Sequence, residues 1–211
     1  MGHAFTDHRH GDLALGADPL DLAARRAAVV DRPWTWIRQV HGARVVTVTE
    51  PGQHAGAEAD AIVTAVPGAA IAVLTADCAP VLLVADGAVG VVHAGWRGLA
   101  GGVVEAAVEA LVTLGYPPLH AVLGPCIRGR CYEFGSSDLD QLADRYGPTV
   151  RSTTAWGTPA LDVAAGIGVA CASFGIELLD ESVCTACSSR HWSHRARGDS
   201  RRQALVAWIE P

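Results

Sequence analysis

The chain has 211 residues, 50% of them hydrophobic, so it is long enough to bury a core as one globular domain spanning residues 1–211. Its formal net charge is −6 and its 16 cationic side chains, all arginines, form no basic stripe, so we expect no nucleic-acid partner. No long uncharged apolar segment and no apolar signal-peptide core are present, so we expect no membrane contact and a cytoplasmic protein.

Apolar runs alternate with segments of helical periodicity along the chain. Runs rich in β-branched residues predict strands at residues 43–49, 59–65, 69–76, 80–86, 88–94, 120–124 and 204–209. Apolar residues at helical spacing predict helices at residues 99–115, 136–147 and 161–175. Because the strands come in clusters with hairpin-like pairs, the pattern favours an α/β fold, a mixed-sheet layered sandwich with flanking helices, over a strict βαβ series.

The first candidate functional residues lie where two predicted strands end. Six cysteines are too few for a disulfide scaffold in a chain of this length, which directs attention to cysteine as a ligand or nucleophile. Cys78 follows Asp77 at a bend before Pro80, and the next strand ends on His93. A short hairpin link between these strands places Cys78 and His93 at the same end of the hairpin.

His41 is a third candidate, again at a strand interruption marked by a glycine. One cysteine and two histidines form a three-ligand set, which for zinc leaves a fourth position open to water or substrate, as in catalytic sites. Thiolate and imidazole also disfavour magnesium and calcium. The spacing alone leaves a second interpretation open, in which Cys78 is a buried small hydrophobe and both histidines are satisfied by hydrogen bonds.

Seven motifs decide between these interpretations. In chain order they are RQVHGARVV, ADAIVT, TADCAPVLL, VVHAGWRG, LGPCIRGRCYEFG, LDVAAG and SHRARGDSRRQA. Together they resemble the YfiH-like family, called both laccase-domain (multicopper polyphenol oxidoreductase) proteins and purine nucleoside phosphorylases. The resemblance implies zinc bound by His41, Cys78 and His93, which we also assign as catalytic, and a fold similar to the catalytic domain of the cytotoxic necrotizing factor toxins.

The activities implied by the resemblance are phosphorolysis of adenosine, inosine, guanosine and methylthioadenosine, and hydrolytic deamination of adenosine. Purine nucleosides and phosphate are therefore the expected partners of a monomer or homodimer. Phosphorolysis must hold phosphate against the anomeric carbon of the ribose, and we expect Arg44 and Arg97 to do so. Matching positions in the C-terminal motif add Arg195 and Arg202. Three roles stay open for Asp77: it orients a ligand histidine, it acts as an acid or base, or it makes only a local turn.

The C-terminal motif departs from the family's usual residues, which puts substrate preference in question more than metal binding. The departures are His194, Ala196, Arg197 and Arg201. Two other activities also stay open. One is a copper phenol oxidase, against which the few scattered histidines argue, and the other is an amidase with Cys78 as nucleophile and His93 as base, including an editing role on cell-wall precursors. A non-catalytic binding module is the residual class.

A second group of possible ligands follows residue 180. A structural zinc site is one interpretation of the group formed by Cys184, Cys187, His191 and His194. However, zinc fingers place a longer stretch between the cysteine pair and the histidine pair. We therefore expect that these four residues do not bind a metal ion. The remaining thiols are interpreted as packing residues: Cys126, Cys131 and Cys171.

Overall fold

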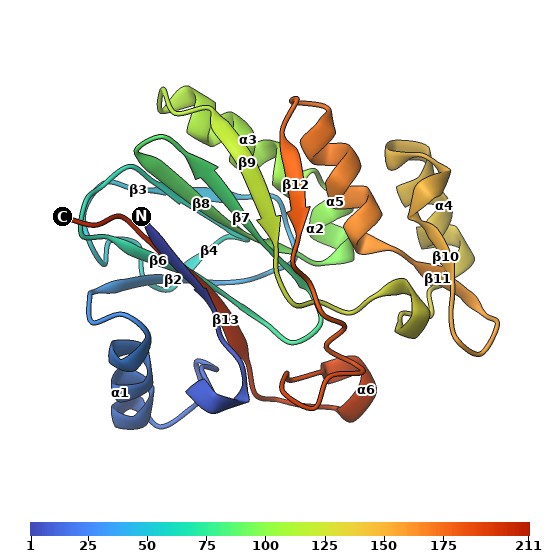
Figure 1. Cartoon of the computed structure of the whole chain (residues 1–211), viewed down its shortest axis with the longest axis horizontal. Helices are drawn as coiled ribbons and strands as arrows, with labels where there is room; N and C mark the ends of the chain where they lie inside the picture. The colour runs from blue at the N-terminus through green and yellow to red at the C-terminus, as the bar shows by residue number, and fades with distance from the viewer.

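Two β-sheets stacked face to face form the centre of the computed structural model, which describes residues 1–211 (Figure 1). The five-stranded sheet has the order β1 (Gly2–Phe5), β13 (Gln203–Trp208), β6 (Ala70–Thr75), β2 (Trp34–Arg38) and β4 (Ala57–Glu58). The six-stranded sheet has the order β12 (Glu177–Asp180), β9 (Pro118–Leu123), β7 (Ala79–Ala85), β8 (Ala88–Ala94), β5 (Ala61–Thr64) and β3 (Val45–Val48). Each sheet contains parallel and antiparallel pairs.

Helices cover the outer faces of both sheets (Figure 1). The six-stranded sheet packs against α2 (Trp96–Ala100), α3 (Val103–Thr113) and α5 (Val163–Ala172), and α1 (Pro19–Val29) covers the five-stranded sheet. The helix α4 (Ser136–Tyr146) packs on α2 and α5. The remaining elements are α6 (His194–Arg197), the hairpin of β10 (Arg151–Thr153) and β11 (Pro159–Leu161), and the 3-10 helices η1 (His8–His10), η2 (Gly129–Cys131) and η3 (Pro148–Val150). None of the α-helices combines the length and the apolar character needed to cross a lipid bilayer.

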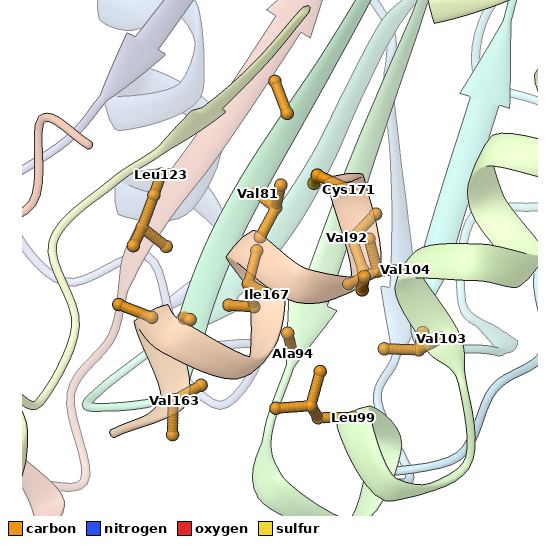
Figure 2. Close-up of a cluster of buried hydrophobic side chains, with 14 of the residues drawn as sticks. Val81, Val92, Ala94, Leu99, Val103, Val104, Leu123, Val163, Ile167 and Cys171 are labelled. Atoms are coloured by element: carbon orange, nitrogen blue, oxygen red, sulfur yellow. The ribbon is translucent and has the colours of Figure 1, made fainter. Parts of the chain in front are cut away.

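The alternation of side chains along the strands produces three apolar layers. Ile71 and Leu205 from one sheet meet Leu82 and Val91 from the other in the layer between the sheets. A larger cluster joins the outer face of the six-stranded sheet to α3 and α5, as Figure 2 shows for the side chains around Ile167. Since both faces of β7 and β8 are buried, these strands are almost continuously apolar in sequence.

The predicted fold class is confirmed, and each of the seven predicted strands is present, with its ends shifted by at most a few residues in β3, β5, β6, β7, β9 and β13. The prediction of one helix over residues 99–115 is wrong. The chain forms α2 and α3 instead, because Gly102 takes a left-handed conformation with φ of +82° between them. The sequence analysis also missed α1, whose single buried residue is Leu22, and the strands β1 and β2.

The hairpin of β7 and β8 positions the candidate residues. Its register pairs Pro80 with His93 and Ala79 with Ala94, so the bend that carries Cys78 lies beside the end of β8. The short link between Ala85 and Ala88 that the sequence predicted is present. Both strands are central in their sheet, and the site is therefore built on the most buried part of the fold.

Replacing Ile167 with alanine tests the packing of α5 on the sheet. Ile167 is fully buried among the side chains of Figure 2, and Ile167→Ala lowers the free energy of unfolding by about 2–5 kcal/mol through lost contacts and a cavity. Val169→Ala on the exposed side of the same helix changes it by only about 0.5 kcal/mol. Urea denaturation measures both, and equal effects would contradict this account of the core.

Candidate active site

His41, Cys78 and His93 come together from three separate segments. His41 lies in the loop after β2, Cys78 at the bend between β6 and β7, and His93 near the end of β8. Their ligating atoms all lie within 4.8 Å of one another, and Cys78 Sγ is 3.8 Å from His41 Nε2. The two imidazole rings meet edge to face, with centroids 4.9 Å apart. The geometry is that of a candidate metal site, and the role of the three side chains as ligands stays a prediction.

Asp60 holds this cluster together, and the sequence analysis did not assign it any role. Its carboxylate is fully buried and lies 2.8 Å from His93 Nδ1, which leaves Nε2 of that ring for the cluster. The same carboxylate accepts hydrogen bonds from the backbone N–H groups of Val40, His41 and Gly42 at 3.2, 2.9 and 2.7 Å. A charged residue directly before the buried strand β5, in the motif ADAIVT, was the available signal.

The backbone at the site adopts conformations that few side chains favour. His41 and Asp77 have φ values of +59° and +96°, in the left-handed region, where non-glycine residues are strained by about 1–3 kcal/mol each. The hydrogen bonds that the Asp60 carboxylate accepts from residues 40–42 stabilise the backbone conformation at His41. Gly95 packs directly against two of the cluster residues. A Cβ atom at this position would lie 2.7 Å from His41 Cδ2 and 3.2 Å from Cys78 Sγ, so the close packing requires a glycine.

Asp77 binds the C-terminal segment. One carboxylate oxygen accepts from Thr185 Oγ1 at 2.6 Å and the other from the backbone N–H of Arg195 at 2.7 Å. Its backbone carbonyl accepts from the N–H of Ile127 at 2.9 Å. These contacts indicate that Asp77 anchors the C-terminal segment, a role that the sequence analysis did not consider. The carboxylate that contacts a cluster histidine is that of Asp60. A catalytic role for Asp77 stays a prediction.

The charges of the cluster are coupled. Burial alone would raise the pKa of Cys78, but the positive charge of His93 and hydrogen bonds to His41 and His93 outweigh burial and lower that pKa to about 6. Burial would lower the pKa of His93, and the Cys78 thiolate and Asp60 instead raise it to about 9. Asp60 is buried too, which raises its pKa, but hydrogen bonds from His93 and the backbone hold the pKa below its ordinary value. Near neutral pH the metal-free cluster is a thiolate beside an imidazolium.

A cavity of about 590 Å³ opens over the cluster, a size suited to a small-molecule ligand. Its lining includes all three cluster residues together with Gln39 and Thr75. The hydroxyl of Thr75 is buried from solvent and has no hydrogen-bond partner in the protein. Gln39 is tied to the backbone of Leu74 by two hydrogen bonds at 2.6 and 2.8 Å. Both residues lie within motifs that the sequence analysis used, RQVHGARVV and TADCAPVLL, yet neither was assigned a role.

The predicted phosphate-binding arginines are not all at this cavity. Arg202 lines it, and its guanidinium donates to the backbone carbonyls of Asp199 and Arg201. Arg195 instead lines a neighbouring pocket and stacks over Tyr132, with 4.9 Å from its guanidinium carbon to the ring centroid. Arg97 stacks over Trp96 at 4.4 Å, and Arg44 is exposed. The roles of all four arginines stay predictions.

Comparison with known proteins places this site in a family. Residues 11–210 match the family model described as "Multi-copper polyphenol oxidoreductase laccase". The chain belongs to this laccase-type family. The predicted YfiH-like resemblance is thereby confirmed, since the crystal structure of the Bacillus licheniformis hypothetical protein YfiH has a TM-score of 0.83 at 25% identity, covering 93% of this chain and 85% of that one.

Further relatives of the laccase-type family agree. The Neisseria meningitidis protein NMB0706 has a TM-score of 0.83 at 29% identity, covering 95% of this chain and 86% of that one. A purine nucleoside phosphorylase of Streptomyces coelicolor is 41% identical over 209 residues, 93% of this chain and 86% of the relative. A purine nucleoside phosphorylase of Streptomyces griseus is 42% identical over 235 aligned positions, 98% of this chain and 94% of the relative.

Replacing Asp60 with asparagine tests whether its charge organises the cluster. The amide keeps the shape of the side chain but loses the charge that fixes His93, so we expect Asp60→Asn to weaken binding of the zinc ion predicted for this cluster by about 10–100-fold. Competition with a chromophoric chelator measures the affinity. Asp144→Asn, at an exposed position on α4, is the control and leaves it unchanged. Unchanged affinity in a folded Asp60→Asn protein would show that the carboxylate does not support the site.

Proposed function

We propose that this chain is a zinc-dependent purine nucleoside phosphorylase that also deaminates adenosine. The observation that carries the proposal is the Cys78, His41 and His93 cluster in the lining of a cavity of nucleoside size. Relatives that match more than nine-tenths of the chain are named purine nucleoside phosphorylases, which supports the same reaction class here.

The donor set suits zinc. One thiolate and two imidazoles are ligands that Zn²⁺ prefers, and three protein ligands leave a coordination position free on the cavity side. The bond from His93 Nδ1 to Asp60 is the outer contact that usually orients a zinc-ligating histidine. When bound, the ion supplies a Lewis acid in the lining of the cavity.

Phosphorolysis replaces one bond at the ribose by another. A phosphate oxygen forms a bond to the anomeric carbon, the bond from that carbon to the purine nitrogen breaks, and the purine leaves with its electron pair and takes up a proton. Arg202 faces the cavity and is the residue best placed to hold the phosphate, with Arg44, Arg97 and Arg195 as further candidates.

Deamination of adenosine uses the same cavity with a different nucleophile. Water adds to the purine carbon that carries the amine, and ammonia leaves after it gains a proton. Because this reaction takes no phosphate, it does not depend on an anion-binding arginine. The two activities therefore share His41, Cys78 and His93 and differ in their need for Arg202.

One second function is favoured by a specific observation. The lowered pKa of Cys78 and the adjacent His41 and His93 are also the arrangement of a cysteine nucleophile with a histidine base, as in an amidase. A multicopper oxidase is not favoured, because it needs several histidine-rich copper sites, and the single cluster containing histidine holds two of the nine.

Replacing Cys78 with serine separates the zinc enzyme from the cysteine amidase. A hydroxyl is a far weaker zinc ligand at neutral pH, so Cys78→Ser loses the ion from this site together with phosphorolysis and deamination. Each activity falls by more than the ~10–100-fold typical of losing an outer contact to a metal ligand. Elemental analysis after dialysis, with chromatographic assays of adenosine and inosine with and without phosphate, makes the measurement. Full zinc retention by the serine variant would overturn the proposal.

Replacing Arg202 with alanine tests the phosphate site. The loss of a charged hydrogen-bond donor raises the KM for phosphate by about tenfold or more, and adenosine deamination is unchanged. Arg201→Ala is the matched control, since Arg201 stacks over Trp192 and does not line the cavity. An equal loss of both activities in Arg202→Ala would show that this arginine does not act through phosphate.

A further inference from the structure

Three cysteines outside the active site form a second cluster. Cys131 ends η2, and Cys184 and Cys187 lie in the segment between β12 and α6. Their sulfur atoms lie within 4.8 Å of one another, and Cys131 Sγ is 3.2 Å from Cys187 Sγ. Sulfur ligands of a tetrahedral zinc are ~3.8 Å apart for Zn–S bonds of ~2.3 Å. The 3.2 Å between Cys131 Sγ and Cys187 Sγ is shorter than that value and clearly longer than the ~2.0 Å of a disulfide bond, and the limit of 4.8 Å on all three pairs leaves room for an ion between the sulfurs.

The local backbone is built to gather the sulfurs. The N–H groups of Cys187 and Ser188 donate to the carbonyl of Cys184 at 3.2 and 2.9 Å, which folds the Cys-x-x-Cys stretch into a tight turn. Two cysteines separated by two residues are the usual half of a structural zinc site.

The histidines of the same segment are not part of this cluster. His191 is buried, and its Nδ1 lies 2.8 Å from Ser188 Oγ. His194 lines the cavity of the active site instead. The sequence analysis rejected a site made of Cys184, Cys187 and these histidines. The structure keeps the cysteine pair together but supplies Cys131, 53 positions before Cys184 in the sequence, as its partner.

We propose that Cys131, Cys184 and Cys187 bind a second metal ion, a thiophilic divalent cation of the Zn²⁺ class, separate from the ion of the active site. Three thiolates without imidazole favour such an ion over magnesium, calcium or manganese. A pocket of about 570 Å³ adjoins the cluster and is lined by Cys131, by Ala186 between the other two cysteines, and by Glu133. The fourth coordination position opens toward this pocket.

The ion joins two segments that both reach the active site. Residues 126–134 and 184–197 have little regular structure of their own, and Cys131 belongs to the first and the other two cysteines to the second. The first segment bonds to the backbone of Asp77 through Ile127, and the second to its carboxylate through Thr185 and Arg195. Crosslinking the segments through a metal therefore stiffens the support of the bend that carries Cys78.

Metal content of purified protein tests the proposal. In protein prepared under reducing conditions, elemental analysis finds zinc at both clusters, and Cys78→Ser retains only the ion of the three-thiol cluster. Cys131→Ser and Cys187→Ser lose that ion and keep the one at the active site. Cys171→Ala, a buried thiol of α5 outside both clusters, is the control and keeps both ions. This pattern also separates a failure here from a failure of the proposed function, which depends on the ion lost in Cys78→Ser.

A second measurement leaves all three cysteines of the cluster in place, so it does not depend on whether their variants fold. Cobalt added to the metal-free Cys78→Ser protein gives intense sulfur-to-cobalt charge-transfer absorption, because the three remaining clustered thiolates bind the ion together. Amide hydrogen exchange of residues 181–202 slows when zinc is added to the same protein. The proposal is overturned if Cys78→Ser binds no cobalt with thiolate absorption, or if Cys131→Ser and Cys187→Ser keep the full zinc content of the native protein. A Cys131–Cys187 disulfide without bound metal in the reduced preparation would overturn it as well.

Discussion

The candidate active site depends on the hydrogen bonds of the buried Asp60 carboxylate. This carboxylate binds His93 on the six-stranded sheet and, through three backbone N–H groups, the loop that carries His41. A buried carboxylate is stable only when its oxygens are bonded, so the charge itself requires these partners to be in place. The loop conformation, including the positive φ of His41, and the orientation of the His93 ring follow from this one interaction.

The same interaction explains the electrostatics of the cluster. Asp60 stabilises the positive form of His93, and His93 in turn stabilises the thiolate of Cys78. A thiolate and correctly oriented imidazoles are what a zinc ion requires of its ligands, and they are also what a cysteine nucleophile requires of a neighbouring base. The same preorganised geometry therefore suits both of the chemistries that we consider for this site.

The C-terminal segment connects the two cysteine-containing clusters. Asp77 precedes Cys78 and accepts hydrogen bonds from Thr185, which lies inside the turn of Cys184 and Cys187, and from Arg195, which follows that turn. The segment between β12 and β13 has only the short α6 as regular structure, so few ladder hydrogen bonds hold it. Polar contacts, and in our proposal a metal ion, replace the apolar packing that supports the rest of the fold.

The sequence by itself determined the fold class and seven of the strands, and it singled out three residues that the structure brings together, His41, Cys78 and His93. Buried strands such as β7 and β8 are almost continuously apolar, and the motifs around His41, Cys78 and His93 are specific enough to be recognised in a single sequence. The tertiary structure alone decided which residues support them. Asp60 binds His93, which lies 33 positions away in the chain, and Cys131 contacts Cys187, which lies 56 positions away. No local spacing in the sequence encodes such contacts. They arise because sheet pairing and loop packing, set by burial of the whole core, bring distant segments to one place.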